Sequence, residues 1–331
     1  MDFMHDLTVY GSARIDAFMI LPVDKAGQLC NIDTGKCVIE LSYSAKLPLD
    51  SVKFLVGGNG ANVAVGTKRL GINSLLAAEL GEGPLADYAY RELEKEIEMP
   101  YVSQTKGIDQ GFGAVINYQG ERTILSYYAP VEPPFPDNSC EAKWAYLTST
   151  GENFEGYYDK VYASLMECKP KLAFNPGGRQ ITKGLDWMKK FLELTEVLLV
   201  NREEAEDIVG MSRTHGKEKE LLDAFVDLGV KTPIITDGRN GSFARSGDNY
   251  YKAGILPIDA VERTGAGDSY SAASISALIK GKSIQEAMLW GTINAASVIG
   301  YIGPEDGLLH DKDMDEWLER ASSSGVSVEE F

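Results

Sequence analysis

Short apolar runs alternate with amphipathic segments through the second half of the chain. Four runs, each bounded by polar or turn-forming residues, have the length and composition of buried strands: Trp144–Leu147, Leu172–Phe174, Val197–Val200 and Ile234–Thr236. Four segments carry apolar residues at helical spacing: Asn153–Met166, Ile181–Leu192, Arg202–Val209 and Lys217–Leu228. Because strands that alternate with helices form parallel sheets covered on both faces, the pattern predicts an α/β fold with a doubly wound, mostly parallel sheet flanked by helices.

The first part of the chain extends the same pattern. Leu7–Tyr10 and Ser74–Leu80 are predicted strands, and Asp87–Glu98 has the spacing of an amphipathic helix. The first strand runs into Gly11 and small residues and then presents Asp16. Loops at the carboxyl ends of parallel strands form ligand sites, so Asp16 is a candidate binding residue, with an ordinary loop acid as the alternative.

Two other segments have the strand–turn–strand pattern of hairpins. The predicted hairpin strands are Ala17–Pro22 with Cys37–Tyr43, around the turn Asp33–Lys36, and Gly111–Tyr118 with Arg122–Tyr128, around Gln119–Glu121. We expect them to form one small β-sheet that projects as a lid over the ligand, or else an edge extension of the main sheet.

This divides the chain into a catalytic domain, a lid and a frayed acidic tail. The predicted boundaries are 1–16, 51–108 and 130–320 for the α/β domain, 17–50 and 109–129 for the lid, and 321–331 for the tail.

Composition excludes some classes of function. The formal net charge is −17, so a nucleic-acid backbone would be repelled. No apolar run approaches the length of a membrane span, and the first residues lack the form of a signal peptide, which favours a cytoplasmic protein. The cysteines have no metal-binding spacing and are therefore expected to be reduced; they are Cys30, Cys37, Cys140 and Cys168.

The most informative motif is a glycine turn that opens a helix, Thr264–Asp268. The N–H groups at such a helix start suit a phosphate, and the glycines allow close approach, so the backbone of Gly265, Ala266 and Gly267 is a candidate anion hole. A carboxylate beside an anion site needs a task, and Asp268 is a candidate base for a hydroxyl that attacks phosphorus. The alternative is an aspartate that caps a helix.

A second glycine cluster, Val56–Gly66, opens another helix. It matches neither the dinucleotide-binding nor the P-loop pattern. Its Gly58 lets a ligand lie against the backbone, and Asn59 and Asn62 can hydrogen-bond to hydroxyls. A tightly packed helix start is the alternative interpretation.

Three further features follow predicted strands or lie on helices. Asn201 and Glu204 lie three residues apart and are candidates to hold Mg²⁺ through water, or else they form a capping box. The loop Thr236–Gly241, with Gly238 inside it, supports a nucleotide or simply turns a hairpin. Asn294 lies in the middle of the predicted helix Ile284–Ile299.

Together, Gly57–Asn62, Asn201-x-x-Glu204 and Thr264–Asp268 closely resemble the motifs of the ribokinase-like, or PfkB, family of carbohydrate kinases, and the resemblance covers nearly the whole chain. It implies transfer of the γ-phosphoryl group of ATP, with Mg²⁺, to an alcohol of a sugar or nucleoside. The implied residues are grouped by role: Asp268 as base with Gly265–Gly267 as anion hole; Asp16, Gly58, Asn59 and Asn62 for the acceptor; Asn201, Thr236, Gly238, Gly241 and Asn294 for the nucleotide; Glu204 for Mg²⁺.

The chain also departs from that family. Glu262-Arg263 stands where relatives often have Asp-Thr, a position that helps to hold a monovalent cation, so a requirement for K⁺ is left open. We expect a free pentose or hexose as acceptor, ribose or fructose first. A nucleoside kinase, with Tyr127 and Tyr128 stacking on a base, and a non-catalytic sugar- or nucleotide-binding protein are the alternatives. Apolar strand residues such as Phe18–Leu21 predict a homodimer through the lids.

Overall fold

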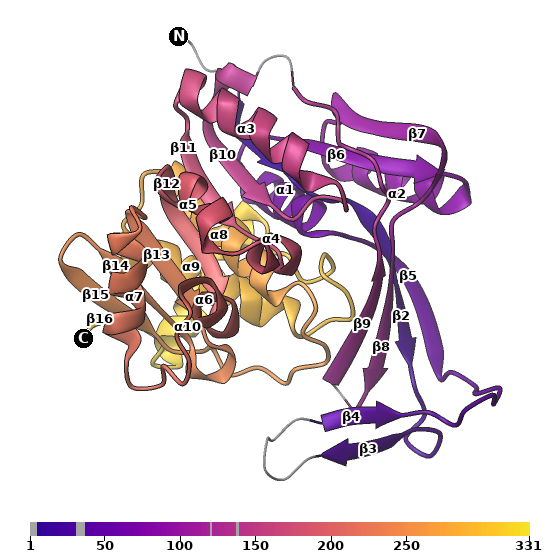
Figure 1. Cartoon of the computed structure of the whole chain (residues 1–331). Helices are drawn as coiled ribbons and strands as arrows, with labels where there is room; N and C mark the ends of the chain where they lie inside the picture. The colour runs from indigo at the N-terminus through magenta and orange to yellow at the C-terminus, as the bar shows by residue number, and fades with distance from the viewer. Residues whose placement is uncertain (1–4, 31–36, 120, 137–138) are drawn as a thin grey trace.

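The computed structural model describes residues 5–30, 37–119, 121–136 and 139–331. One ten-stranded sheet organises the body of the molecule (Figure 1). In spatial order its strands are β16 (Val328–Glu330), β15 (Asn249–Ala253), β14 (Ser242–Ser246), β13 (Thr232–Thr236), β12 (Thr195–Asn201), β11 (Lys171–Asn175), β10 (Ala142–Thr148), β1 (His5–Tyr10), β6 (Ser74–Glu82) and β7 (Tyr101–Asp109). The strands from β13 to β7 run parallel, and β14, β15 and β16 are antiparallel.

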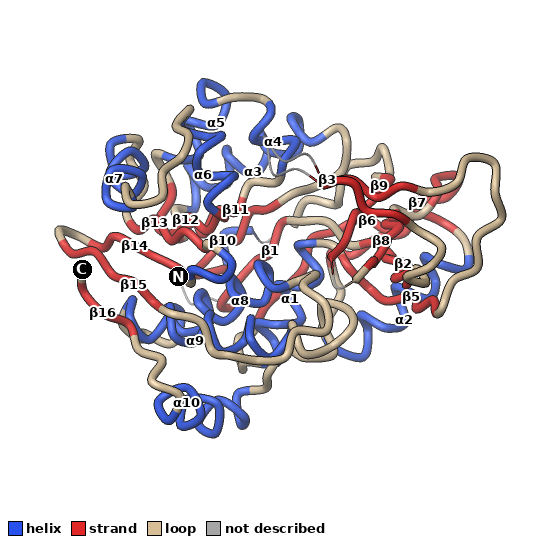
Figure 2. Tube along the Cα trace, turned by 90° about the horizontal axis from the view of Figure 1, so that it is seen from below, coloured by secondary structure: helices blue, strands red, loops and turns tan. Residues whose placement is uncertain are grey.

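Helices cover both faces of this sheet (Figure 2). They are α1 (Asn59–Arg69), α2 (Pro84–Glu96), α3 (Phe154–Cys168), α4 (Gly178–Thr182), α5 (Leu185–Leu192), α6 (Arg202–Val209), α7 (Glu218–Asp227), α8 (Ala266–Ile279), α9 (Ile284–Val298) and α10 (Met314–Ser323). The predicted helix over 181–192 is two helices, because Gly184 adopts a φ of 89° between α4 and α5.

Alternate side chains of each central strand enter different cores. On β12, Val197 and Leu199 pack with residues of α1, α2, α8 and α9, whereas Leu198 and Val200 pack with residues of α3, α5, α6 and α7. A strand that is buried on both faces exposes no side chains to solvent, so all of its positions are apolar in the sequence. The predicted doubly wound α/β fold is confirmed.

The lid is a separate four-stranded sheet in the order β5 (Ser51–Gly57), β2 (Arg14–Ile20), β8 (Phe112–Tyr118) and β9 (Glu121–Tyr127). The predicted hairpin of β8 and β9 is present, although residue 120 of its turn lies outside the described residues. The other predicted hairpin is wrong: β2 pairs with β5 and β8 instead. The boundary at residue 51 is also wrong, since β5 belongs to the lid sheet.

A two-stranded sheet of β3 (Gly27–Cys30) and β4 (Cys37–Glu40) extends from the lid (Figure 1). The predicted turn Asp33–Lys36 lies outside the described residues. The side chains of Phe18 and Leu21 are buried, so they do not form the exposed apolar strand that was expected. Propensity alone does not distinguish a central strand such as β2 from an edge strand.

The register of the lid sheet separates two faces. The cross-strand row Phe54, Ala17, Ala114 and Leu125 lies on one face, together with Tyr127. The opposite face carries Arg14 and Asp16 of β2, Gly57 of β5, Gly113 of β8, and Arg122 and Ser126 of β9. Because residues paired across strands share a face, the side chains of Arg14, Asp16, Arg122 and Ser126 lie on one side of the sheet.

The final residues are ordered, so the predicted frayed tail is wrong. Helix α10 continues through residue 323, and β16 pairs antiparallel with β15, with Glu330 opposite Tyr251. Val326 is buried between these two elements in the sequence. The acidic composition of this stretch reflects an exposed edge strand and not a lack of structure.

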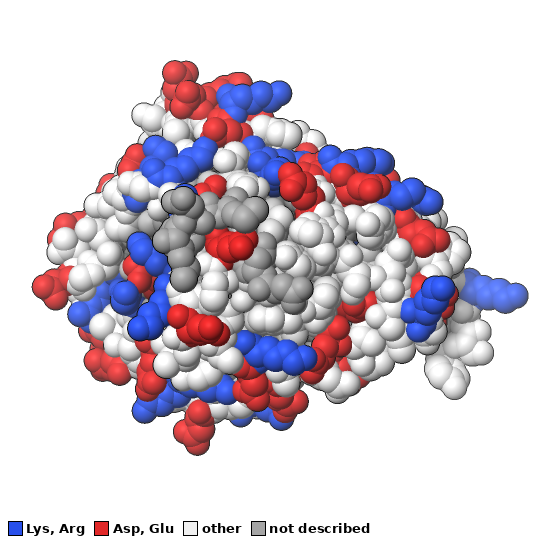
Figure 3. Space-filling model, turned by 90° about the horizontal axis from the view of Figure 1, so that it is seen from above, with Lys and Arg blue, Asp and Glu red and all other residues white. Residues whose placement is uncertain are grey.

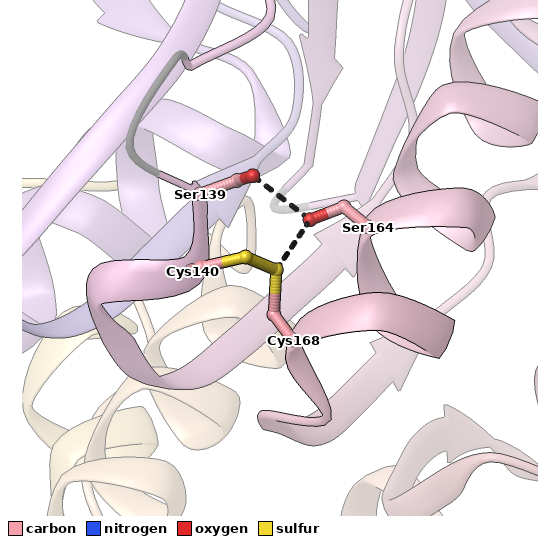
Figure 4. The surroundings of a disulfide bond; sticks show 4 residues. All are labelled: Ser139, Cys140, Ser164 and Cys168. Carbon is pink, nitrogen blue, oxygen red and sulfur yellow. Dashed lines mark hydrogen bonds between the residues drawn. A yellow bond between two sulfur atoms is a disulfide. The ribbon is translucent and has the colours of Figure 1, made fainter. Parts of the chain in front are cut away.

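The structure joins the cysteines in two disulfides, so the prediction of reduced thiols is wrong for it. Cys30 is bonded to Cys37, across the β3–β4 pair, and Cys140 to Cys168 at the end of α3. In Figure 4, Ser164 lies beside the second disulfide, and its hydroxyl donates to the hydroxyl of Ser139 at 2.9 Å. Pairing between distant residues cannot be read from cysteine spacing alone.

Within the described chain, none of the helices has both the length and the apolar character needed to cross a bilayer. On the face shown in Figure 3, acidic and basic side chains are interspersed, with uncharged surface between them.

Candidate active site

The first turn of α8 places Asp268 beside a glycine turn. Gly265 precedes the helix with a φ of 82°, and a Cβ there would collide with Pro304, so only glycine fits. A Cβ on Gly267 would meet no protein atom within 4 Å. The N–H of Ala266 donates weakly to the carbonyl of Arg263, at 3.3 Å, whereas helix geometry leaves the next N–H groups without a partner inside the helix. The helix start therefore presents donors to open space.

Two asparagines of α1 hold the carboxyl group of Asp268. Asn59 Nδ2 donates to Asp268 Oδ1 at 3.0 Å, and Asn62 Nδ2 donates to Oδ2 at 2.7 Å. Ser149, after β10, in turn donates to Asn59 Oδ1 at 2.9 Å. Asn59 and Asn62 were predicted to bind the acceptor; in the structure their amide groups orient the carboxyl of Asp268.

Burial raises the pKa of Asp268 to about 6, and the nearby carboxylate of Asp16 acts in the same direction. The hydrogen bonds from Asn62 and Asn59 and the charge of Arg14 lower the pKa and oppose that rise. The carboxyl is consequently ionised at neutral pH but is still basic enough to accept a proton.

The glycines around α1 bring this helix close to the first strand. Gly58 has a φ of 101°, and a Cβ on it would meet the carbonyl oxygen of Ser12 at 2.6 Å. A Cβ on Gly60 would meet the backbone of Gly11 at 2.7 Å. The close approach packs the start of α1 against the end of β1, so the packing interpretation of this motif is present in the structure, and its role in binding the acceptor stays a prediction.

Asp16 lies on the polar face of the lid, between two glycines. A Cβ on either Gly57 or Gly113 would collide with its carboxyl group. Arg14 Nε lies 2.7 Å from Asp16 Oδ1. Burial raises the pKa of Asp16, although the charge of Arg14 opposes the rise. Asp16 is thus a buried carboxyl on the lid, near the carboxyl of Asp268 on the body.

A cavity of about 870 Å³ opens on the other side of the glycine turn. Thr236, Gly238 and Gly241, predicted to bind the nucleotide, all line it, as do Ala266 and Gly267. Its wall also includes residues that sequence reasoning missed: Arg263, Thr292, Ala295, Ala296, Ile299 and Arg320. Thr292, Ala295 and Ala296 lie on α9 and Arg320 lies on α10, and no sequence motif marks them. The volume suits a nucleotide-sized ligand.

Asn201 and Glu204 form the capping box of α6. The Asn201 side chain accepts from the N–H of Glu204 at 2.8 Å, and Glu204 Oε2 accepts from the N–H of Asn201 at 2.9 Å. Burial raises the pKa of Glu204, and the charge of Asp268 acts in the same direction. The capping interpretation is therefore present in the structure, and the carboxyl of Glu204 lies close enough to Asp268 for their charges to interact.

Asn294 does not line the nucleotide cavity. It is fully buried; Nδ2 donates to the carbonyl of Ser269 at 2.8 Å, and Oδ1 accepts from the N–H of Leu309 at 3.0 Å. These bonds tie α9 to α8 and to the following loop. Both ends of the amide bond to the protein, and a role for Asn294 in binding the nucleotide stays a prediction.

Ion pairs connect the lid to the loop before the glycine turn. Arg263 Nη1 lies 2.8 Å from Glu121 Oε1, and Arg122 Nε lies 3.8 Å from Glu262 Oε1. The same oxygen of Glu262 accepts from the N–H and the hydroxyl of Thr264, at 2.9 and 2.6 Å. The guanidinium group close to Glu262 is therefore that of Arg122, not that of the adjacent Arg263.

Comparison with known proteins identifies the class of this site. The pfkB family carbohydrate kinase model matches residues 27–311. An ATP-dependent 6-phosphofructokinase of Thermoanaerobacterium thermosaccharolyticum is 24% identical over 282 residues, which cover 80% of this chain and 85% of that protein. The structure is also similar to the ribokinase of Arabidopsis thaliana complexed with ribose and ATP (TM-score 0.77, 19% identity, 96% of this chain and 99% of that chain). It is similar to the adenosine kinase of Sinorhizobium meliloti (TM-score 0.74, 20% identity, 95% and 99%).

The two structural similarities establish the ribokinase fold, and the family match spans most of the chain. The family match agrees with the geometry of the site, because a carboxyl beside the free N–H groups of a helix N-terminus suits transfer of a phosphoryl group to an alcohol. The chain belongs to the pfkB family of carbohydrate kinases and is a phosphotransferase.

Proposed function

We propose that this kinase transfers the γ-phosphoryl group of ATP to a hydroxyl of a small sugar, with Asp268 as the general base. One observation carries the proposal: the carboxyl of Asp268, held by Asn59 and Asn62, stands next to Gly267, at which the helix start faces the nucleotide-sized cavity. The acceptor lies on the side of Asp16 and the lid, and ATP lies on the side of Gly267.

Each part of the site then has a task. Asp268 takes the proton from the acceptor hydroxyl as the oxygen attacks the γ-phosphorus, and the bond from phosphorus to the bridging oxygen of ADP breaks. The N–H groups at Gly265–Gly267 stabilise the negative charge that develops on the phosphoryl oxygens. Asp16 binds acceptor hydroxyls, and Thr236, Gly238 and Gly241 support the nucleotide.

Mg²⁺ fits the charge at this site. Burial and the charge of Asp268 raise the pKa of Glu204, and one oxygen of Glu204 is not used by the capping box. Glu204 would hold the ion through water, with Asn201 beside it, and Mg²⁺ would neutralise the charge on the phosphates.

The tyrosines do not favour the nucleoside alternative. Arg179 stands over the ring of Tyr128, with its Cζ atom 4.5 Å from the ring centre, and therefore occupies a face on which a base would stack. A sugar acceptor needs no such face. The retained Asp268 and its glycines also favour catalysis over a binding protein that lacks turnover.

The test is ATP consumption with Mg²⁺ across ribose, fructose, sugar phosphates, sugar acids and adenosine, each with and without K⁺. We expect turnover with sugars and a loss of at least about a hundredfold in kcat for Asp268→Asn. Asp207→Asn, which removes an exposed carboxyl on α6, is the matched control. Equal activity of Asp268→Asn and the parent would refute the mechanism, and adenosine as the best acceptor would refute the substrate class.

We also propose that the chain forms a homodimer through the lid. The apolar face of the lid sheet exposes Val52, Phe54, Leu125 and Tyr127, whose side chains are 44–58% exposed. A contiguous apolar face on a projecting sheet favours burial against a second copy. Sedimentation velocity of the parent and of Leu125→Glu tests this: the parent should sediment as a dimer and the variant as a monomer.

A further inference from the structure

Arg202, the first residue of α6, is a charged side chain that is only 7% exposed. Its Nη2 atom donates to Glu218 Oε1 at 2.8 Å and lies 2.9 Å from Asp237 Oδ2. Its Nη1 atom donates to Thr214 Oγ1 at 2.9 Å. Because a buried cation is tolerated only where it is paired, these contacts fix the guanidinium group in one place. They join α6 to the start of α7 and to the loop that follows β13.

The position needs a guanidinium group and not merely a positive charge. The Cζ atom of Arg202 lies 4.8 Å from the centre of the Phe243 ring on β14. A planar guanidinium group can stack on a ring while its nitrogens reach acceptors on separate elements, and the single nitrogen of a lysine cannot do both. The contacts of Arg202 are therefore specific to arginine.

One partner of Arg202, Asp237, closes the loop that lines the nucleotide-sized cavity. The N–H of Asp237 donates to the carbonyl of Gly241 at 2.8 Å, and its Oδ2 atom accepts from Asn240 Nδ2 at 3.0 Å. Gly238 and Gly241 line the cavity of about 870 Å³, whereas Arg202 does not. The carboxyl that Arg202 holds is thus the one that fixes the shape of this loop.

The same arginine also lies in the turn that we propose for Mg²⁺. Arg202 stands between Asn201 and Glu204, which form the capping box of α6. Asn201 and Thr236 are register partners at the ends of the neighbouring parallel strands β12 and β13. The first turn of α6 and the loop after β13 consequently leave the sheet side by side, and the pair of Arg202 with Asp237 sets the distance between them.

We propose that Arg202 is a positioning residue of this kinase, which holds the loop Gly238–Gly241 through Asp237 in the conformation that binds the nucleotide. The inference rests on the proposed function, in which ATP occupies the large cavity. Since Arg202 does not line the cavity, its replacement changes nucleotide binding only by changing the shape of the loop.

Nucleotide affinity tests this inference. Isothermal titration with ADP and Mg²⁺ measures binding without turnover, and saturation kinetics give KM for ATP and for the most active sugar. The variants are Arg202→Met, Arg202→Lys, Asp237→Asn and the double variant of Arg202→Met with Asp237→Asn. The matched control is Arg245→Met, because Arg245 pairs with Asp223 at 2.7 Å on the neighbouring strand β14 and does not line the cavity. Urea denaturation shows that each variant is folded.

We expect Arg202→Met to raise the dissociation constant of ADP and KM for ATP at least about tenfold, with KM for the sugar changed less than about twofold. Arg202→Lys should raise them less. Asp237→Asn should also raise them, and the double variant should be no worse than the worse single variant, because both changes remove the same contact. Arg245→Met should lower stability and leave ADP binding unchanged.

If Arg202→Met and Asp237→Asn bind ADP as the parent does, the inference is overturned and the proposed function stands. If Arg245→Met weakens ADP binding as much as Arg202→Met, the effect is a general loss of structure and the inference is overturned. If ADP binding depends on Arg202 but the parent phosphorylates no sugar, the proposed function fails and the inference stands. Should Arg202→Met not fold, Asp237→Asn decides the question, since it removes the charge and keeps the shape of the side chain.

Discussion

The carboxyl that we propose as the base should also destabilise the folded protein. The pKa of Asp268 is about 6 in the folded chain and has an ordinary value of 3.8. A carboxyl whose pKa is higher in the folded state carries a penalty that is absent below the lower value, grows as pH rises and is complete above the higher one. At 1.36 kcal/mol per pKa unit, the full penalty is about 3 kcal/mol, of which about 2 kcal/mol develops between pH 4.5 and pH 8.

Asp268→Asn removes this penalty together with the charge. The variant also places an amide N–H₂ against the donors of Asn59 or Asn62, at a cost that does not depend on pH. The informative quantity is therefore the difference in unfolding free energy between variant and parent, measured by urea denaturation at several pH values. We expect this difference to change by about 2 kcal/mol in favour of the variant from pH 4.5 to pH 8.

Activity and stability should separate in this experiment. The variant should lose its kinase activity over the whole range, whereas Asp207→Asn should retain it and show a difference that changes little with pH. A flat pH dependence for Asp268→Asn would refute the reasoning, because it would mean that burial does not raise the pKa of this carboxyl.

Three further predictions concern other parts of the molecule. Gly267→Ala should change the free energy of unfolding by less than about 1 kcal/mol, since the added Cβ meets no protein atom within 4 Å. It should lower kcat at least about tenfold, because the methyl group fills the proposed anion site. Urea denaturation and saturation kinetics measure the two effects, and an unchanged kcat would contradict the prediction. Cys140→Ser should lower the unfolding free energy by about 3.6 kcal/mol in oxidised protein, because the bond to Cys168 closes a loop with a sequence separation of 28; no loss relative to the reduced parent would count against the disulfide. A double-mutant cycle on Glu121 and Arg263 should give a coupling energy below about 1 kcal/mol in unfolding, as both side chains are partly exposed; a much larger value would contradict this view of the pair.

The sequence predicts best what depends on local pattern. The buried strands of the body and the helix starts at Asn201 and Gly265 are visible because apolar runs and caps are local signals. Strand partners are not local: the sequence shows that residues 14–20 form a strand but not that this strand pairs with residues 51–57. The frayed tail was an error of the same kind, since the pairing of β16 with β15 depends on a distant partner.

In the candidate site, sequence motifs indicate the glycine and asparagine positions but not the other residues that line the same cavity. Thr236, Gly238 and Gly241 line the cavity of about 870 Å³, and Asn294 does not. Their roles in binding the nucleotide stay predictions, and a buried asparagine in a helix can serve packing as well as binding. Arg14 lies two residues before Asp16 in the sequence, but its contact with the ring of Tyr128 depends on the fold. Only the folded lid brings those residues together.

The candidate site is divided between the lid sheet and the α/β body, and this division affects hydrolysis of ATP in the absence of an acceptor. Asp16 and Arg14 belong to the lid sheet, whereas Asp268 and the anion hole belong to α8. In the function that we propose, a movement of the lid sheet away from the body would separate Asp16 from Asp268 and let water enter. We expect the site to be complete only when acceptor and lid are both in place, because the acceptor supplies contacts on both sides. Hydrolysis of ATP without an acceptor should accordingly be slow compared with transfer of the phosphoryl group to the sugar.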